Sequence, residues 1–163
     1  MSVESGIATF RDSGGLWDKY DVYEVATVVG WQKNPGKVLE FYIMRRKQVF
    51  EASPHEGHKA LVKFNENYKV QIITQNIDNL HERAGSQHIL HLHGAISKAR
   101  SVKNRERVIG IGSDEIHLGD TADDSDQLRP HVIWFGEAVP MMERAIEIVQ
   151  EAEIFVVIGI LPV

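Results

Sequence analysis

Short apolar runs that do not alternate with polar residues are the feature that most constrains the fold of this chain. They occupy residues 69–74, 131–136 and 154–159, and segments with the 3.6-residue spacing of amphipathic helices lie before and between them. Strands have continuous apolar runs when helices cover both sides of their sheet. The pattern therefore predicts an α/β fold in which a parallel sheet has helices on both faces.

The predicted helices have recognisable ends. In residues 34–53, Val38, Tyr42 and Val49 share one apolar stripe, and Pro35 fits the first turn. Further helices are expected over residues 54–67, 78–85 and 140–153, the third of them ending at Gly85, with a short strand over residues 88–94. The apolar faces expected of the second and last helices are Gly57, Ala60, Leu61 and Phe64, and Met142, Ala145, Ile146 and Val149.

Size and composition exclude several classes of protein. The 163 residues, 43% of them hydrophobic, suffice for one domain with a core. A net charge of −5 does not attract a polyanion, so no nucleic-acid partner is expected. No apolar run reaches the roughly 20 residues that cross a bilayer, so no membrane association is expected. The chain has no cysteine and its first residues do not resemble a signal peptide, so we expect a cytoplasmic location.

Polar residues follow directly on the strand predicted over residues 69–74. Gln75, Asn76 and Asp78 lie where a parallel sheet gathers its loops and helix N-termini, which is the edge at which such sheets bind ligands. Propensity alone favours helix capping for Asn76 and Asp78, since the next helix begins there. Capping and a functional role are compatible.

Three histidines recur at close spacing, at positions 88, 91 and 93. His91 and His93 point to the same side of a strand, so a metal site is one hypothesis. The spacing lacks the tighter signature of a helical zinc site, which favours a single general base instead. Gly94, directly after His93, would let a ligand approach the backbone.

Residues 97–128 interrupt the alternating order. Basic side chains gather in the first half of this segment and acidic side chains in the second, which is typical of a solvated insert and leaves a cation or phosphate site as the minority hypothesis. With no repeats and no linker, residues 1–163 form a single domain with a small charged insert around residues 97–128.

Five stretches occur together in this order: SGIATFRDSGGLW, TQNIDNLHERAG, LHLHG, RPHVIWFGEAVP and FVVIG. Their order and approximate spacing resemble those of the sirtuins, the Sir2-like NAD-dependent protein deacylases, and the resemblance spans nearly the whole chain. It implies a Rossmann-like sheet with NAD as co-substrate, and cofactor contacts at Gly6, Ile7, Thr9, Phe10, Arg11, Trp17, Gln75, Asn76, Ile77 and Asp78.

The resemblance also implies the reaction. The acyl oxygen of a modified lysine attacks C1′ of the nicotinamide ribose as nicotinamide leaves, His93 then acts as general base on the ribose hydroxyls, and Asn76 shares the catalytic role. The products would be free lysine, nicotinamide and O-acyl-ADP-ribose. The substrate lysine would be gripped by residues 132–135, with Val132, Trp134 and Phe135 as contacts, through added-strand pairing.

Tyr42 and Arg45 narrow the acyl group that the resemblance implies. They lie three residues apart on a predicted helix and so share a face, and they match the Tyr-x-x-Arg pair that recognises succinyl and malonyl groups in one branch of the sirtuins. A core tyrosine and a surface arginine are the alternative that any amphipathic helix would offer.

The chain also departs from the family pattern. Without cysteine it cannot build the structural zinc site of most sirtuins, so no zinc is expected and the charged insert stands in place of the zinc module. The Gly-Ala-Gly turn before Ser2 and the strands after Val163 are missing, which implies a domain truncated at both ends. A catalytically inactive sirtuin fragment or binding module is therefore an alternative function, and ADP-ribosyl transfer to protein is a lesser one.

Overall fold

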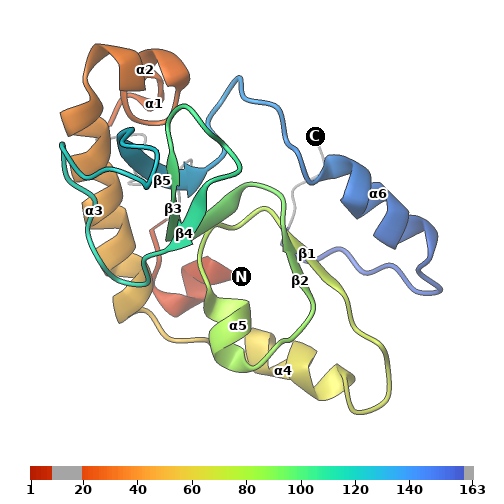
Figure 1. The fold of residues 1–163 in the computed structure, drawn as a ribbon. Helices are drawn as coiled ribbons and strands as arrows, with labels where there is room; N and C mark the ends of the chain where they lie inside the picture. Colours follow the sequence, from red (N-terminus) through yellow and green to blue (C-terminus); the bar gives the residue numbers. More distant parts are fainter. Residues whose placement is uncertain (9–19, 160–163) are drawn as a thin grey trace.

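The computed structural model describes residues 1–8 and 20–159, which form a mixed α/β fold (Figure 1). The helices are the 3₁₀ turn η1 (Ser2–Ser5), α1 (Val22–Val25), α2 (Val28–Lys33), α3 (Pro35–Glu51), α4 (Glu56–Phe64), α5 (Leu80–Ala84) and α6 (Met142–Gln150). The strands are β1 (Ile72–Thr74), β2 (Ile89–His91), β3 (Gly94–Ser101), β4 (Val108–Gly110) and β5 (Leu128–Val132).

The strands form two small sheets. β1 and β2 are parallel, with Thr74 opposite His91, as expected for the two short strands around the polar segment. β3 lies between β4 and β5 and is antiparallel to both. The α/β prediction with a parallel sheet is confirmed, but residues 131–136 were expected to join that sheet, and instead β5 pairs with the antiparallel β3.

Helix α3 has the residues and the packing predicted for it. Pro35 occupies its first turn and the side chain of Asn34 accepts a hydrogen bond from the N–H of Lys37, which caps the start. Val38, Tyr42 and Val49 are buried as predicted, since they face the core. Figure 1 shows α3 running alongside the antiparallel sheet of β3, β4 and β5.

Two predicted apolar surfaces are not buried. Phe64 of α4 is 52% exposed, and the buried side chain of that helix is His58. In α6 only Ala145 of the predicted stripe is buried, while Met142, Ile146 and Val149 face solvent. Both helices have an apolar stripe, but a stripe is buried only where another element packs against it.

The prediction of a strand over residues 154–159 is wrong, since the structure has no strand there. These residues form no hydrogen-bonded ladder, and the side chains of Ile154 and Phe155 are exposed. A strand needs a neighbouring strand to pair with, and no described segment pairs with this one.

Residues 97–128, predicted to be a solvated charged insert, include most of β3 and all of β4. Arg107 pairs with Asp123 and Asp124, and Lys103 pairs with Asp126. Lys103, Arg107 and Asp123 are exposed as expected, whereas Asp124 and Asp126 are mostly covered. Arg100 is an exception, since it is 3% exposed and points into the protein. In the described part of the chain, no helix combines the length and hydropathy needed to cross a membrane.

Buried histidines are expected to make the fold less stable in mild acid. Burial lowers the pKa of His58 and of His131 to about 4, and it also lowers the pKa of His81. Unfolded histidine titrates near 6.5, so between about pH 6.5 and pH 4 the unfolded chain binds more protons than the folded chain. The free energy of unfolding should therefore fall by on the order of 2 kcal/mol as the pH drops through this window.

Urea unfolding at pH 7 and at pH 4.5 measures this loss, with His58→Gln as the informative variant. His58 is fully buried, and its ring lies edge-on to those of His55 and His81. The variant should show a shallower pH dependence. An equal loss in both proteins would assign the acid sensitivity to other groups.

Candidate functional site

His93 lies between β2 and β3 and is held by a hydrogen bond that fixes its tautomer. Its Nδ1 lies 3.0 Å from the carbonyl oxygen of Gln75. A carbonyl oxygen can only accept, so Nδ1 carries the hydrogen, and in the neutral ring Nε2 keeps its lone pair. The ring is half-buried, which leaves Nε2 as a base positioned at the end of the parallel sheet.

Gly94 is required by the chain's own packing. Its φ of +78° is unfavourable for other residues, and a Cβ at this position would lie 2.2 Å from the carbonyl oxygen of His131. The close approach of the neighbouring strand β5 is enough to explain this glycine, and room for a ligand at Gly94 stays a prediction. The pairing of Gly94 with Val132 of β5 holds the backbone next to His93 in place.

A hydrogen-bonded cluster links the N-terminal turn to the loop after β1. The Oγ of Ser2 donates to Oδ2 of Asp78 at 2.7 Å, and Nδ2 of Asn76 donates to the same Oγ at 2.7 Å. Asp78 also accepts from the N–H of Leu80 at the start of α5, so part of the predicted capping role belongs to it. Asn76 does not cap α5. The cluster holds both predicted site residues against η1.

Ser2 was not identified from the sequence, because an isolated serine near the start of a chain carries no signal. Two other residues near it were expected at the cofactor. Gly6 ends η1 in a left-handed conformation, while the side chain of Ile7 is 3% exposed and belongs to the core. The remaining residues expected to contact the cofactor from this part of the chain lie outside the described residues: Thr9, Phe10, Arg11 and Trp17.

The other residues of the loop after β1 have different surroundings. Gln75 is exposed, and Ile77 packs against the core while its carbonyl accepts the N–H of Ile96. The loop is thus anchored by Ile77 and presents Gln75 to solvent.

His91 contacts the loop after β1 and the helix α5. Its Nδ1 donates to the carbonyl of Asn76 at 2.9 Å, and its Nε2 lies 2.7 Å from Glu82. Burial disfavours the charged ring, but the hydrogen bonds to Glu82 and Asn76 outweigh burial and raise its pKa. No group of three potential metal ligands occurs among residues 1–8 and 20–159, and His88 lies on the surface. The metal hypothesis for the three histidines therefore has no support in the described structure.

Tyr42 and Arg45 share the buried face of α3. They are 4% and 5% exposed, so Arg45 is not the surface arginine of the alternative interpretation. Burial lowers the pKa of Arg45 to about 10, against the opposing effects of Asp78 and Tyr42. The guanidinium therefore remains charged at neutral pH, within the electrostatic influence of Asp78.

The backbone of residues 133–135 is already paired within the chain. The N–H of Ile133 donates to the backbone carbonyl of His93, and that of Phe135 donates to the backbone carbonyl of Ala26. The N–H of Trp134 donates to the carboxylate of Glu137. Added-strand pairing with a peptide therefore cannot use these three N–H groups. Of the side chains expected to contact the substrate, Val132 and Trp134 are buried and Phe135 is 54% exposed.

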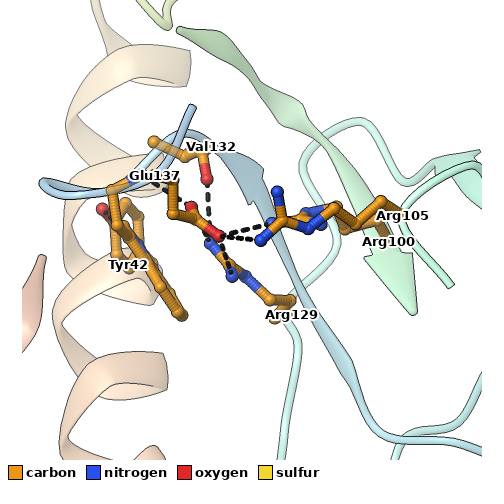
Figure 2. A network of polar contacts seen from close by, with 7 residues as sticks. Tyr42, Arg100, Arg105, Arg129, Val132 and Glu137 are labelled. Atoms are coloured by element: carbon orange, nitrogen blue, oxygen red, sulfur yellow. Dashed lines mark hydrogen bonds and ion pairs between the residues drawn. The ribbon is translucent and has the colours of Figure 1, made fainter. Parts of the chain in front are cut away.

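Glu137 is the centre of a buried ion-pair network that the sequence did not reveal (Figure 2). Both of its oxygens accept from Arg129 at 3.0 Å, and Oε1 also accepts from Arg100 at 3.0 Å. Arg105 reaches the same oxygen at 3.4 Å from a largely exposed position. The three arginines, Glu137, Trp31 and Trp134 are among the residues that line a pocket of about 410 Å³.

Comparisons of sequence and structure point to one protein family. The sequence pattern of the Sir2 family matches residues 1–161. An NAD-dependent protein deacylase of Helicobacter pylori is 53% identical over 98% of this chain and 69% of its own length, and one of Bacteroides thetaiotaomicron is 52% identical over 98% and 70%.

Among solved structures, a complex of a Sir2 homologue with NAD has a TM-score of 0.81 and 37% identity, covering 91% of this chain and 60% of its own. A Sir2 protein with a deacetylated p53 peptide and 3′-O-acetyl ADP ribose has a TM-score of 0.71 and 27% identity, covering 92% and 63%. The chain thus spans less than two thirds of the length of these two solved chains.

Proposed function

The chain belongs to the Sir2 family, and from that premise we propose that it is an NAD-dependent protein-lysine deacylase, which transfers the acyl group to ADP-ribose as nicotinamide is released. One observation carries the proposal. His93 is held through Nδ1 by the carbonyl of Gln75, which leaves Nε2 as the basic nitrogen at the edge of the sheet.

The polar groups around His93 fit an NAD ribose and carboxamide. Gln75 offers an exposed amide, and Asn76 and Asp78 are held in place by Ser2. When bound, NAD would supply the electrophilic ribose carbon to which the acyl oxygen adds. Nε2 of His93 would take the proton from a ribose hydroxyl, and the amide dipoles of Gln75 and Asn76 would stabilise charge that develops beside it.

A dicarboxylic acyl group is the substrate that Tyr42 and Arg45 favour. Arg45 is a buried cation on the same face of α3 as Tyr42, and its Nη1 donates to the side chain of Gln48 at 3.1 Å. A guanidinium beside a phenol suits the terminal carboxylate of a succinyl group. We infer that succinyl-lysine is preferred to acetyl-lysine.

The protein substrate would lie across residues 132–137. Because the N–H groups of residues 133–135 and the carbonyl groups of Val132 and Trp134 are engaged, the peptide would contact this segment through the exposed ring of Phe135. We propose that the β3, β4 and β5 sheet is held by ion pairs and needs no zinc, since the chain has no cysteine ligands. The same lack of cysteine favours the cytoplasm over an oxidising compartment.

Turnover of two peptides tests the proposal. The chain is incubated with saturating NAD and with a succinyl-lysine or an acetyl-lysine peptide of the same sequence, and nicotinamide and free lysine peptide are quantified. We expect one nicotinamide per deacylated peptide and a higher kcat/KM for the succinyl peptide. A folded chain with no turnover of either peptide would instead favour a non-catalytic binding module.

A further inference from the structure

Trp134 donates a hydrogen bond to the residue proposed to select the acyl group. Its indole Nε1 lies 3.0 Å from the hydroxyl oxygen of Tyr42, and both side chains are buried. An indole N–H can only donate, so the tyrosine oxygen must accept. The single hydroxyl hydrogen of Tyr42 is then directed away from the indole.

Tyr42 stays a donor over the whole neutral range. Burial raises the pKa of its hydroxyl to about 12, with the hydrogen bond from Trp134 and the charge of Arg129 acting in the opposite direction. A protonated hydroxyl whose lone pair is occupied by Trp134 is suited to donate to an anion such as a carboxylate.

Glu137 and Arg129 fix Trp134 from two directions. The Oε2 of Glu137 accepts the backbone N–H of Trp134 at 2.8 Å, and the guanidinium carbon of Arg129 lies 3.1 Å from the centroid of the indole ring. Arg129 also donates to the carbonyl of Val132, so backbone and ring are held by the same pair of charges. Figure 2 shows the carboxylate between the arginines, beside Tyr42 of α3.

We propose that Trp134 is a specificity-determining residue for charged acyl groups, because it orients the hydroxyl of Tyr42 toward the acyl carboxylate, and that Glu137 is the positioning residue that holds Trp134. This inference rests on the proposed deacylase function. It adds that the preference for a charged acyl group depends on contacts in series, from the ion pair of Glu137 and Arg129 through the indole of Trp134 to the hydroxyl of Tyr42. We call this series the relay.

Peptide binding in the absence of NAD tests the relay. The equilibrium constants of a fluorescent succinyl-lysine peptide and of the matching acetyl-lysine peptide are measured for the natural chain and for Trp134→Phe, which keeps the ring and removes the N–H. Loss of one buried hydrogen bond corresponds to about a tenfold change. The preference for the succinyl peptide should therefore fall about tenfold in the variant.

A double-mutant cycle distinguishes the relay from simple packing. If Trp134 acts through the hydroxyl of Tyr42, then Trp134→Phe should have no further effect on the succinyl preference in a Tyr42→Phe background. Two independent losses that add would overturn the proposal. A preference unchanged in folded Trp134→Phe would overturn it as well.

Glu137→Gln and Arg105→Gln form the matched pair for the positioning role. The first removes the charge that holds Trp134 and should lower the succinyl preference; the second removes the exposed partner at 3.4 Å and should leave the preference within about twofold. Equal effects would overturn the role of Glu137. Should Glu137→Gln fail to fold, the cycle between Tyr42 and Trp134 still decides the relay.

Binding and turnover separate this inference from the function on which it rests. Succinyl-selective binding that requires Trp134, without nicotinamide release, would support the relay and contradict the deacylase proposal. Turnover of both peptides with no succinyl preference in binding would support the deacylase proposal and overturn the relay.

Discussion

Replacing His93 by alanine is expected to lower the turnover of an acyl-lysine peptide by a factor of about 10² to 10⁴, the usual contribution of a general base. The physical reason is the fixed tautomer: the Gln75 carbonyl holds Nδ1, so Nε2 is the nitrogen that takes the proton. Initial rates of nicotinamide release at saturating NAD measure the loss. The KM for the peptide should change little, because the lost interaction is made in the transition state.

His88→Ala is the matched control for this experiment. His88 lies in the same stretch, but it is exposed and is not one of the residues expected at the cofactor or substrate. Its removal should leave the rate within about twofold, as for most surface substitutions. Similar rates in His93→Ala and in the natural chain would remove His93 from the reaction.

Replacing Glu137 by alanine is expected to lower the free energy of unfolding by about 3–5 kcal/mol, because it leaves two buried cations without their carboxylate. The side chains of Arg100, Arg129 and Glu137 are 4%, 6% and 2% exposed. Burial already lowers the pKa of Arg129 to about 10 against the favourable effect of Glu137, so the charged form depends on that partner. Urea unfolding at pH 7 measures the loss.

Glu147→Ala supplies the comparison. Glu147 pairs with Arg144 at 2.7 Å on the surface of α6, and both side chains are 58% exposed. Exposed pairs contribute at most about 1 kcal/mol, so this variant should be almost as stable as the natural chain. Losses of similar size in both variants would mean that the buried network does not stabilise the fold.

Local sequence signals predicted α3, α4, α5 and α6 but not α1 or α2, and they predicted the burial of helix faces less well. Helix α3 could be predicted because Pro35, its capping residue and its apolar stripe all lie within one segment. The stripe of α6 is equally local, yet Ile146 is exposed, because burial depends on which element packs against it. Periodicity within a segment says nothing about that neighbour.

Strand pairing was the harder part of the fold. β5 was expected in the parallel sheet, but it pairs antiparallel with β3, at a bend where Gly94 allows the close approach of His131. An apolar run is compatible with either pairing, so its partner could not be deduced from the run itself.

The candidate site was predicted where residues adjoin a strand end and missed where distant residues meet. Asn76, Asp78 and His93 follow predicted strands, and the resemblance to a family assigned roles to them. Ser2 contacts Asp78, and Glu137 contacts Arg100. The partners in each pair lie far apart in the sequence, so neither contact could be predicted from a local pattern. The only local hint of the network is that Arg129 precedes an apolar run and Glu137 follows directly after it.

The fate of the ADP-ribose part of NAD is the most direct test of whether the chain transfers an acyl group to ADP-ribose. NAD labelled in its adenine would be incubated with the chain and a succinyl-lysine peptide, and the label followed by chromatography and mass spectrometry. We expect label in O-acyl-ADP-ribose, in equal amount to the deacylated peptide and to nicotinamide. Label that remains attached to protein, or NAD left intact by a folded chain, would contradict this expectation.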